Sequence, residues 1–203
     1  MAIKNIVFDV GNVLVKWAPS EITAMAFPDE LFPIDLSQRI FKSPIWYDLN
    51  LGKLTEAQSI KLYNQQMGIS EEALEKMMDI VKNSLTPVDG SFELLEAIYD
   101  LGIPLYSITD NVKEIVSFLK NKYDFFDKFI GVVVSADIGV LKPSEKIYQH
   151  LLDQYQLKPQ ETVFIDDLIT NVEGARKVGM QGIHFIDAAA CRYELRHLGV
   201  VGL

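Results

Sequence analysis

The sequence of 203 residues has little cysteine, few basic residues and no long apolar run. Cys191 is the single cysteine, which excludes an intramolecular disulfide and favours a reducing compartment. The net charge of −9 argues against nonspecific nucleic-acid binding, because that needs lysine and arginine to neutralise phosphates. No stretch approaches a membrane span in length, and Asp9 interrupts the N-terminal apolar segment, unlike in a signal peptide. We therefore predict a cytoplasmic protein without nucleic-acid or membrane partners.

Short apolar runs alternate with helical patterns over most of the chain. Apolar residues make up 49% of it and charged residues 23%, as in ordinary globular proteins. Such alternation predicts a parallel sheet that is covered by helices on both faces. We therefore predict an α/β, Rossmann-like, doubly wound parallel sheet, with strands at 4–9, 105–109, 129–135, 162–165 and 182–186.

The segment after the first predicted strand differs, because it contains no good strand-like run. Thr55 begins a capping-box pattern, and Ser70 precedes two glutamates at the start of another helical pattern. We predict an all-helical subdomain inserted after the first strand. The predicted boundaries are 1–15 and 87–203 for the α/β core, and 16–86 for the helical insertion.

Acidic residues stand where two of these strands end. Ligands of open parallel sheets bind at the carboxyl ends of the strands. Asp9 follows the first strand, and a carboxylate there can attack phosphorus to form an aspartyl-phosphate, although it can also simply cap a turn. Asp166 and Asp167 repel each other unless a cation is present, and their oxygens suit Mg²⁺. The alternative is a solvated pair that caps the next helix.

Five further residues complete a possible phosphoryl-transfer site. Lys142 precedes Pro143 at the start of a predicted helix. It can neutralise charge on the nucleophile and the phosphoryl group, although a single lysine is more often solvated. Thr109 offers a hydroxyl at a strand end. The backbone N–H groups of Asp110 and Asn111 after it can bind phosphate or merely begin a helix. Asn171 can orient a ligand from the helix after the acidic pair.

The candidate residues lie in four short segments of the chain. The segments are Phe8-Asp9-Val10-Gly11-Asn12-Val13-Leu14, Ser107-Ile108-Thr109-Asp110, Gly139-Val140-Leu141-Lys142-Pro143, and Phe164 to Asn171 followed by Glu173-Gly174-Ala175-Arg176. Their order resembles the four motifs of the haloacid dehalogenase-like hydrolase superfamily. The resemblance implies that the helical insertion is the family's cap. The motif Phe-Asp-x-Gly-Asn-Val is similar to that of the α-glucose-1-phosphate phosphatase branch.

The chain departs from the family's pattern at two positions. Gly11 stands where most family phosphatases have a second aspartate that serves as general acid and base, and Asp110 stands where the family usually has asparagine. The resemblance still implies a Mg²⁺ site, in which Gly11 lends its backbone carbonyl and Asp9 and Asp167 lend side-chain oxygens. Asn12 is a candidate for substrate contact.

The resemblance implies a Mg²⁺-dependent phosphatase that acts on a small phosphorylated metabolite. When the general acid is missing, esters whose leaving group has a lower pKa lose less of their hydrolysis rate, so we favour a sugar 1-phosphate. Trp46 and Tyr47 either line the sugar or belong to the core of the cap. The alternatives are a 2-haloacid dehalogenase, a phosphonate hydrolase or a non-catalytic phosphate-binding protein, and the last is supported by Gly11.

Overall fold

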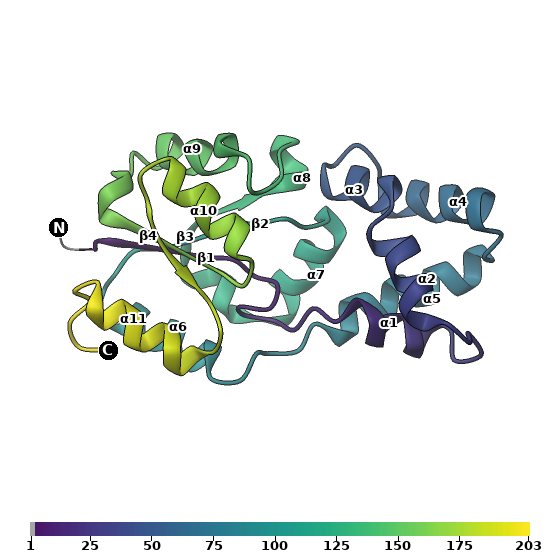
Figure 1. The fold of residues 1–203 in the computed structure, drawn as a ribbon, viewed down its shortest axis with the longest axis horizontal. Coiled ribbons are helices and arrows are strands. Elements are labelled where there is room, and N and C mark those ends of the chain that lie inside the picture. The colour runs from purple at the N-terminus through teal and green to yellow at the C-terminus, as the bar shows by residue number, and fades with distance from the viewer. Residues whose placement is uncertain (1–2) are drawn as a thin grey trace.

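The core of the protein is a five-stranded parallel sheet (Figure 1). The computed structural model describes residues 3–203. The strand order is β3-β2-β1-β4-β5, so the first strand lies at the centre. The strands are Asn5–Phe8 (β1), Leu105–Thr109 (β2), Phe129–Val134 (β3), Thr162–Asp166 (β4) and Gln181–His184 (β5).

Helices of the core cover both faces of the sheet. They are Ser91–Asp100 (α6), Lys113–Lys122 (α7), Ser135–Ile138 (α8), Glu145–Gln154 (α9), Ile169–Lys177 (α10) and Ala188–His197 (α11), with short 3-10 turns at Asp124–Lys128 (η1) and Pro159–Glu161 (η2). Ile6 and Phe8 of β1 join a large cluster that contains buried residues of α6, α7 and α11. Val7 joins a second cluster with buried residues of α9 and α10. Because neighbouring side chains in a strand point in opposite directions, this pattern shows that both faces of the sheet are covered.

A group of five helices, which we call the cap, lies beside the sheet on the right of Figure 1. Two chain connections join it to the core and run side by side: Val15 pairs with Pro87 in a β-bridge, and the N–H of Lys16 donates to the carbonyl of Thr86 at 2.8 Å. These contacts lie close to the predicted boundaries, which stay predictions. The helices are Pro19–Ala26 (α1), Pro33–Phe41 (α2), Pro44–Asn50 (α3), Glu56–Met67 (α4) and Glu71–Ser84 (α5).

Local signals in the cap sequence act as predicted. Thr55 and Gln58 form the reciprocal capping box of α4, and the hydroxyl of Ser70 caps α5. Each bond satisfies a backbone N–H that the first helical turn leaves without a partner. None of the helices in residues 3–203 combines the length and apolar character needed to cross a bilayer.

The predicted α/β sheet with its helical insertion is confirmed, and three local expectations need correction. The strand predicted for 129–135 ends at Val134, and Ser135 begins α8. Lys142 does not begin a helix, because α9 starts at Glu145. The N–H groups of Asp110 and Asn111 do not open α7, which starts at Lys113. Lys142, Asp110 and Asn111 therefore lie in connections at the carboxyl edge of the sheet, and Ser135 lies at the start of α8.

Candidate active site

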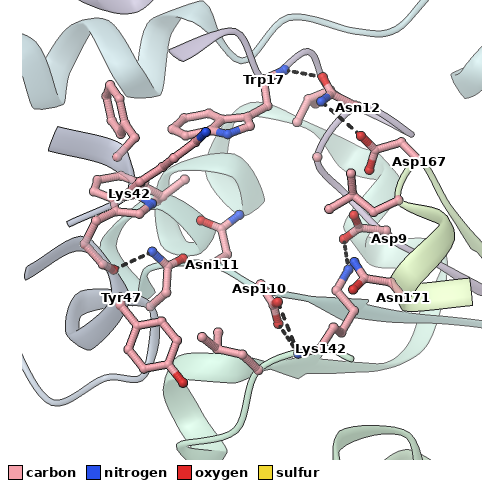
Figure 2. Close-up of a pocket in the computed structure, with 18 of the residues that line it drawn as sticks. Asp9, Asn12, Trp17, Lys42, Tyr47, Asp110, Asn111, Lys142, Asp167 and Asn171 are labelled. Carbon is pink, nitrogen blue, oxygen red and sulfur yellow. Dashed lines mark hydrogen bonds and ion pairs between the residues drawn. The ribbon is translucent and has the colours of Figure 1, made fainter. Parts of the chain in front are cut away.

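A cavity of about 550 Å³ lies between the carboxyl edge of the sheet and the cap (Figure 2). This size suits a ligand much larger than a phosphate ion. Polar residues of the core line one side of it, and α2, α3 and the first connection of the cap line the other. Of the predicted site residues, the lining includes Asp9, Gly11, Asn12, Asp110, Asn111, Lys142, Asp167 and Asn171.

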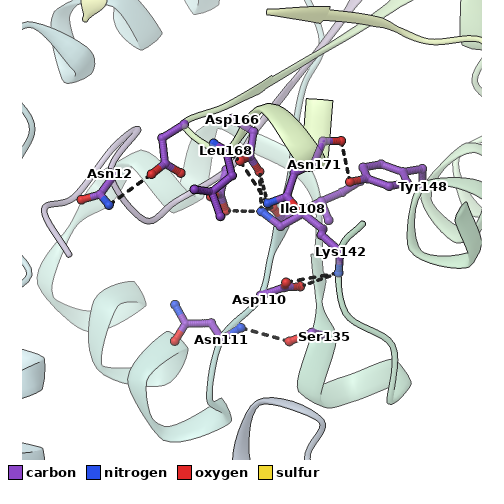
Figure 3. Close-up of polar contacts among 12 residues, drawn as sticks. Asn12, Ile108, Asp110, Asn111, Ser135, Lys142, Tyr148, Asp166, Leu168 and Asn171 are labelled. Atoms are coloured by element: carbon purple, nitrogen blue, oxygen red, sulfur yellow. Dashed lines mark hydrogen bonds and ion pairs between the residues drawn. The ribbon is translucent and has the colours of Figure 1, made fainter. Parts of the chain in front are cut away.

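Lys142 joins two carboxylates at the floor of the cavity (Figure 3). Its Nζ lies 2.8 Å from Oδ1 of Asp9 and 2.7 Å from Oδ2 of Asp166. The lysine side chain is only 2% exposed, and that of Asp166 is fully buried. Burial disfavours the charged ammonium, but the carboxylates of Asp9, Asp166 and Asp110 outweigh it and raise the pKa of Lys142. The site therefore holds a fixed positive charge beside Asp9.

The positive charge near Asp9 does not offset the cost of burying its carboxylate. Burial raises the pKa of Asp9 to about 8, and Asp166 adds to this rise, while Lys142 opposes it. A carboxylate must be ionised to act as a nucleophile. A second cation in the site would therefore favour the reactive form of Asp9.

Asp166 is held in place by donors from three elements. Its Oδ2 receives the bond from Lys142, its Oδ1 accepts from the N–H of Leu168 at 2.8 Å, and Nδ2 of Asn171 lies 3.1 Å from both oxygens. The hydroxyl of Tyr148 donates to the carbonyl of Asn171 at 2.8 Å (Figure 3). The predicted ligand-orienting residue Asn171 thus positions Asp166.

Asn12 connects the turn after β1 with the loop after β4. It has a positive φ of 53°, which asparagine tolerates better than most residues. Its Nδ2 donates to Oδ2 of Asp167 at 3.2 Å, and its Oδ1 accepts from the N–H of Trp17 at 2.8 Å. Asn12 therefore orients a predicted metal ligand at the cavity wall (Figure 2).

The carboxylates form a cluster that fits a cation. Asp9, Asp166 and Asp167 each bring an oxygen within 4.8 Å of the others. Burial, and in smaller part Asp166, raises the pKa of Asp167. Because both oxygens of Asp166 already accept hydrogen bonds, Asp9 and Asp167 are better placed to bind the ion directly. A hard divalent cation that takes one or two protein carboxylates suits this donor set.

The residues after β2 line the cavity, but Thr109 does not. Thr109 is 1% exposed at the end of β2 and is absent from the lining. Both carboxylate oxygens of Asp110 accept from the N–H of Lys142 at 3.1 Å. Burial raises the pKa of Asp110 to about 6, although Lys142 opposes the rise. The N–H of Asn111 donates to the hydroxyl of Ser135 at 3.0 Å.

Several lining or bridging residues were missed by sequence reasoning. Ser135 is fully buried, and its hydroxyl donates to the carbonyl of Asn50 at 2.7 Å, which ties the end of α3 in the cap to the core. Trp17 and Phe41 line the cavity with Trp46. Trp46 and Tyr47 were singled out as possible substrate contacts, and both line the cavity. The only sequence signal for Trp17 is its place shortly after the first motif.

Two phosphatases are similar to this chain in sequence over almost their whole length. A sesquiterpene phosphatase of Aspergillus oryzae is 29% identical over 195 residues, which cover 96% of each chain. A D-ribitol-5-phosphate phosphatase of Bacteroides thetaiotaomicron is 25% identical over 209 residues, which cover 95% of this chain and 97% of the relative.

The fold also matches solved structures. A haloacid dehalogenase family enzyme of Bacteroides thetaiotaomicron, crystallised in complex with magnesium and inorganic phosphate, matches with a TM-score of 0.73 and 19% identity. The match covers 90% of this chain and 93% of that one, and at this identity it shows the likeness of fold. The family model for haloacid dehalogenase-like hydrolases matches residues 3–179. The chain therefore belongs to the haloacid dehalogenase-like hydrolases.

Proposed function

We propose that the protein is a Mg²⁺-dependent phosphatase that hydrolyses a small phosphomonoester through an aspartyl-phosphate on Asp9. The observation that carries this proposal is the Asp9 carboxylate at the cavity floor, 2.8 Å from the buried ammonium of Lys142. The phosphatases among its relatives support the same reaction class. The magnesium and phosphate in the related crystal structure support Mg²⁺ as the cation.

The reaction has two steps. A carboxylate oxygen of Asp9 attacks phosphorus, the bond from phosphorus to the leaving oxygen breaks, and that oxygen takes a proton from water. Water then attacks the phosphorus of the aspartyl-phosphate, which releases inorganic phosphate and restores the Asp9 carboxylate. Lys142 holds positive charge beside the transferring group through both steps. Mg²⁺, when held by Asp9, Asp167 and the carbonyl of Gly11, supplies further neutralisation of phosphate charge.

The leaving group departs without help from an acid at position 11. Gly11 lines the cavity and carries no side chain that could donate a proton. General acid catalysis contributes about 10²–10⁴-fold, so its loss is tolerated best by leaving groups of low pKa. A sugar 1-phosphate meets this condition and stays a prediction from the sequence. An aryl phosphate also meets it.

The acidic cluster favours phosphoryl transfer over the alternative of haloacid dehalogenation. A 2-haloacid is an anion, and it would approach Asp9, Asp166 and Asp167 with only Lys142 to balance them. A phosphomonoester would meet the same repulsion, but a divalent cation held by these carboxylates removes it. A phosphatase therefore uses the cluster, whereas a metal-free dehalogenase would be hindered by it.

The test is phosphate release from acetyl phosphate and a panel of phosphomonoesters, with Mg²⁺ and with EDTA. We expect release that needs both Mg²⁺ and Asp9, so that wild type with EDTA and Asp9→Asn with Mg²⁺ both fall to background. Asp89→Asn is the matched control, because its side chain is 99% exposed and far in sequence from the motifs. Equal release by wild type and Asp9→Asn would refute the nucleophile. No release from any substrate would favour a binding protein.

A further inference from the structure

The cavity has two chemically different sides. Asp9, Asp167 and Lys142 lie on one side, and Trp17 and Tyr47 lie across the cavity from them (Figure 2). Ligand pockets of this kind fix a polar group at a few charged residues and take up the rest of the ligand on apolar surface. The charged side holds the phosphate under the proposed function, so the other side contacts the leaving group.

Three aromatic side chains form one continuous surface on the cap side, which we call the aromatic wall. Trp17 and Trp46 stack with ring centroids 5.7 Å apart and an interplanar angle of 12°. Phe41 packs edge-on against both, at 5.3 Å from Trp17 and 4.8 Å from Trp46. Interlocked rings cannot turn independently, so the wall is a preformed apolar surface. Leu85 and Ile115 extend the apolar lining.

Two polar side chains beside the aromatic wall already have partners within the protein. The hydroxyl of Ser43 donates to the carbonyl of Ile40 at 2.7 Å and accepts from the N–H of Trp46 at 3.1 Å. Nδ2 of Asn50 donates to the carbonyl of Trp46 at 2.8 Å. A sugar hydroxyl placed against these two groups would compete with hydrogen bonds that already exist, and buried hydroxyls without partners weaken binding.

We infer that the substrate's leaving group is an apolar aryl group that packs against the aromatic wall of Trp17, Phe41 and Trp46. This inference rests on the proposed function, because it takes the phosphate to be held at Asp9 and Lys142. The two requirements come from different parts of the molecule. The aromatic wall favours an apolar group, and Gly11 favours a leaving oxygen of low pKa. An aryl phosphate satisfies both.

A binding measurement tests the aromatic wall directly. The protein contains only two tryptophans, Trp17 and Trp46, so its tryptophan fluorescence reports on this surface alone. With Mg²⁺ present, we expect benzylphosphonate, which is not hydrolysed as an ester, to change this fluorescence saturably. Methylphosphonate, which lacks the ring, should bind at least about tenfold more weakly. Equal affinity for the two phosphonates would overturn the inference.

A kinetic measurement separates this inference from the proposed function. 2-Naphthyl and phenyl phosphate share a phenolic leaving oxygen but differ in apolar size, so the ratio of their kcat/KM values reports on packing. We expect wild type to favour 2-naphthyl phosphate by at least about tenfold, and Trp46→Ala or Trp46→Leu to reduce that ratio. Phe32→Ala, an aromatic truncation at a cap residue that is 65% exposed, should keep it.

The outcomes distinguish the inferred apolar leaving group from the proposed phosphatase activity. Hydrolysis of phenyl and acetyl phosphate without preference for 2-naphthyl phosphate would overturn the apolar leaving group and leave the phosphatase intact. A higher kcat/KM for glucose 1-phosphate than for 2-naphthyl phosphate would also overturn it, in favour of the sugar. Failure to hydrolyse any ester, acetyl phosphate included, would overturn the proposed function itself.

Discussion

Replacing Asp110 with asparagine should stabilise the protein at neutral and higher pH. The carboxylate accepts from the backbone N–H of Lys142 at 3.1 Å with each oxygen, and burial raises its pKa from the ordinary 3.8 to about 6. The folded protein therefore binds the Asp110 proton more tightly than the unfolded chain does. Asparagine keeps an acceptor for Lys142 but carries no charge that must be desolvated.

The sign and size follow from linkage between proton binding and folding. The stability contributed by Asp110 is fully present below about pH 3.8 and is lost as the pH rises through about 6. The gap between 3.8 and about 6 corresponds to roughly 3 kcal/mol. Asp110→Asn should therefore raise the free energy of unfolding by about 3 kcal/mol near pH 8 and by less than about 1 kcal/mol near pH 4.

Urea denaturation of wild type and Asp110→Asn, followed from about pH 4 to pH 8 in EDTA, measures this difference. Asp89→Asn is the control, because its exposed side chain should give no pH-dependent difference. A stability difference that does not change with pH, or a less stable Asp110→Asn near pH 8, would refute the reasoning. Either result would mean that Asp110 is ionised at little cost in the folded protein.

Three further predictions concern the site and the cap. Lys142→Met leaves Asp9 and Asp166 buried without their cation, so we expect the free energy of unfolding at pH 7 to fall by about 3–5 kcal/mol, and by less at low pH. Urea denaturation measures this loss, and an unchanged midpoint would contradict the prediction. Gly52→Ala should destabilise by more than about 2 kcal/mol, because Gly52 has a φ of 69° and an added Cβ would collide with the carbonyl of Ala136. Gly68→Ala, at a φ of 70° in open space, should cost only about 1–2 kcal/mol, and equal losses would exclude the collision. A Cβ added at Gly11 meets nothing closer than Cβ of Trp17 at 3.9 Å, so we expect Gly11→Asp to fold. It should raise kcat more on alkyl than on aryl phosphates, by up to about 10²-fold, and an equal effect on both would show that no acid was gained.

Much of the fold could be predicted from local sequence, because its signals are local. Apolar runs ending in Asp9 and Asp166 mark strands, and parallel strands bring their carboxyl ends to one edge. The capping residues Thr55 and Ser70 mark helix starts through bonds to backbone only three residues away. By contrast, α11 was not predicted, because its buried residues Ala188, Cys191 and Leu195 are few and two are small.

The sequence by itself determined which chemical groups meet at the sheet edge, since strand order along the chain places Asp9, Lys142 and Asp167 there. Only the tertiary structure decided how those groups are used. In the folded protein, both oxygens of Asp166 accept hydrogen bonds from other residues, and burial raises the pKa of Asp110 to about 6. The rings of Trp17 and Trp46 also stack on each other only in the folded protein. These properties depend on distances between segments far apart in the chain, and such distances are set by packing of the cap on the core, which no local pattern encodes.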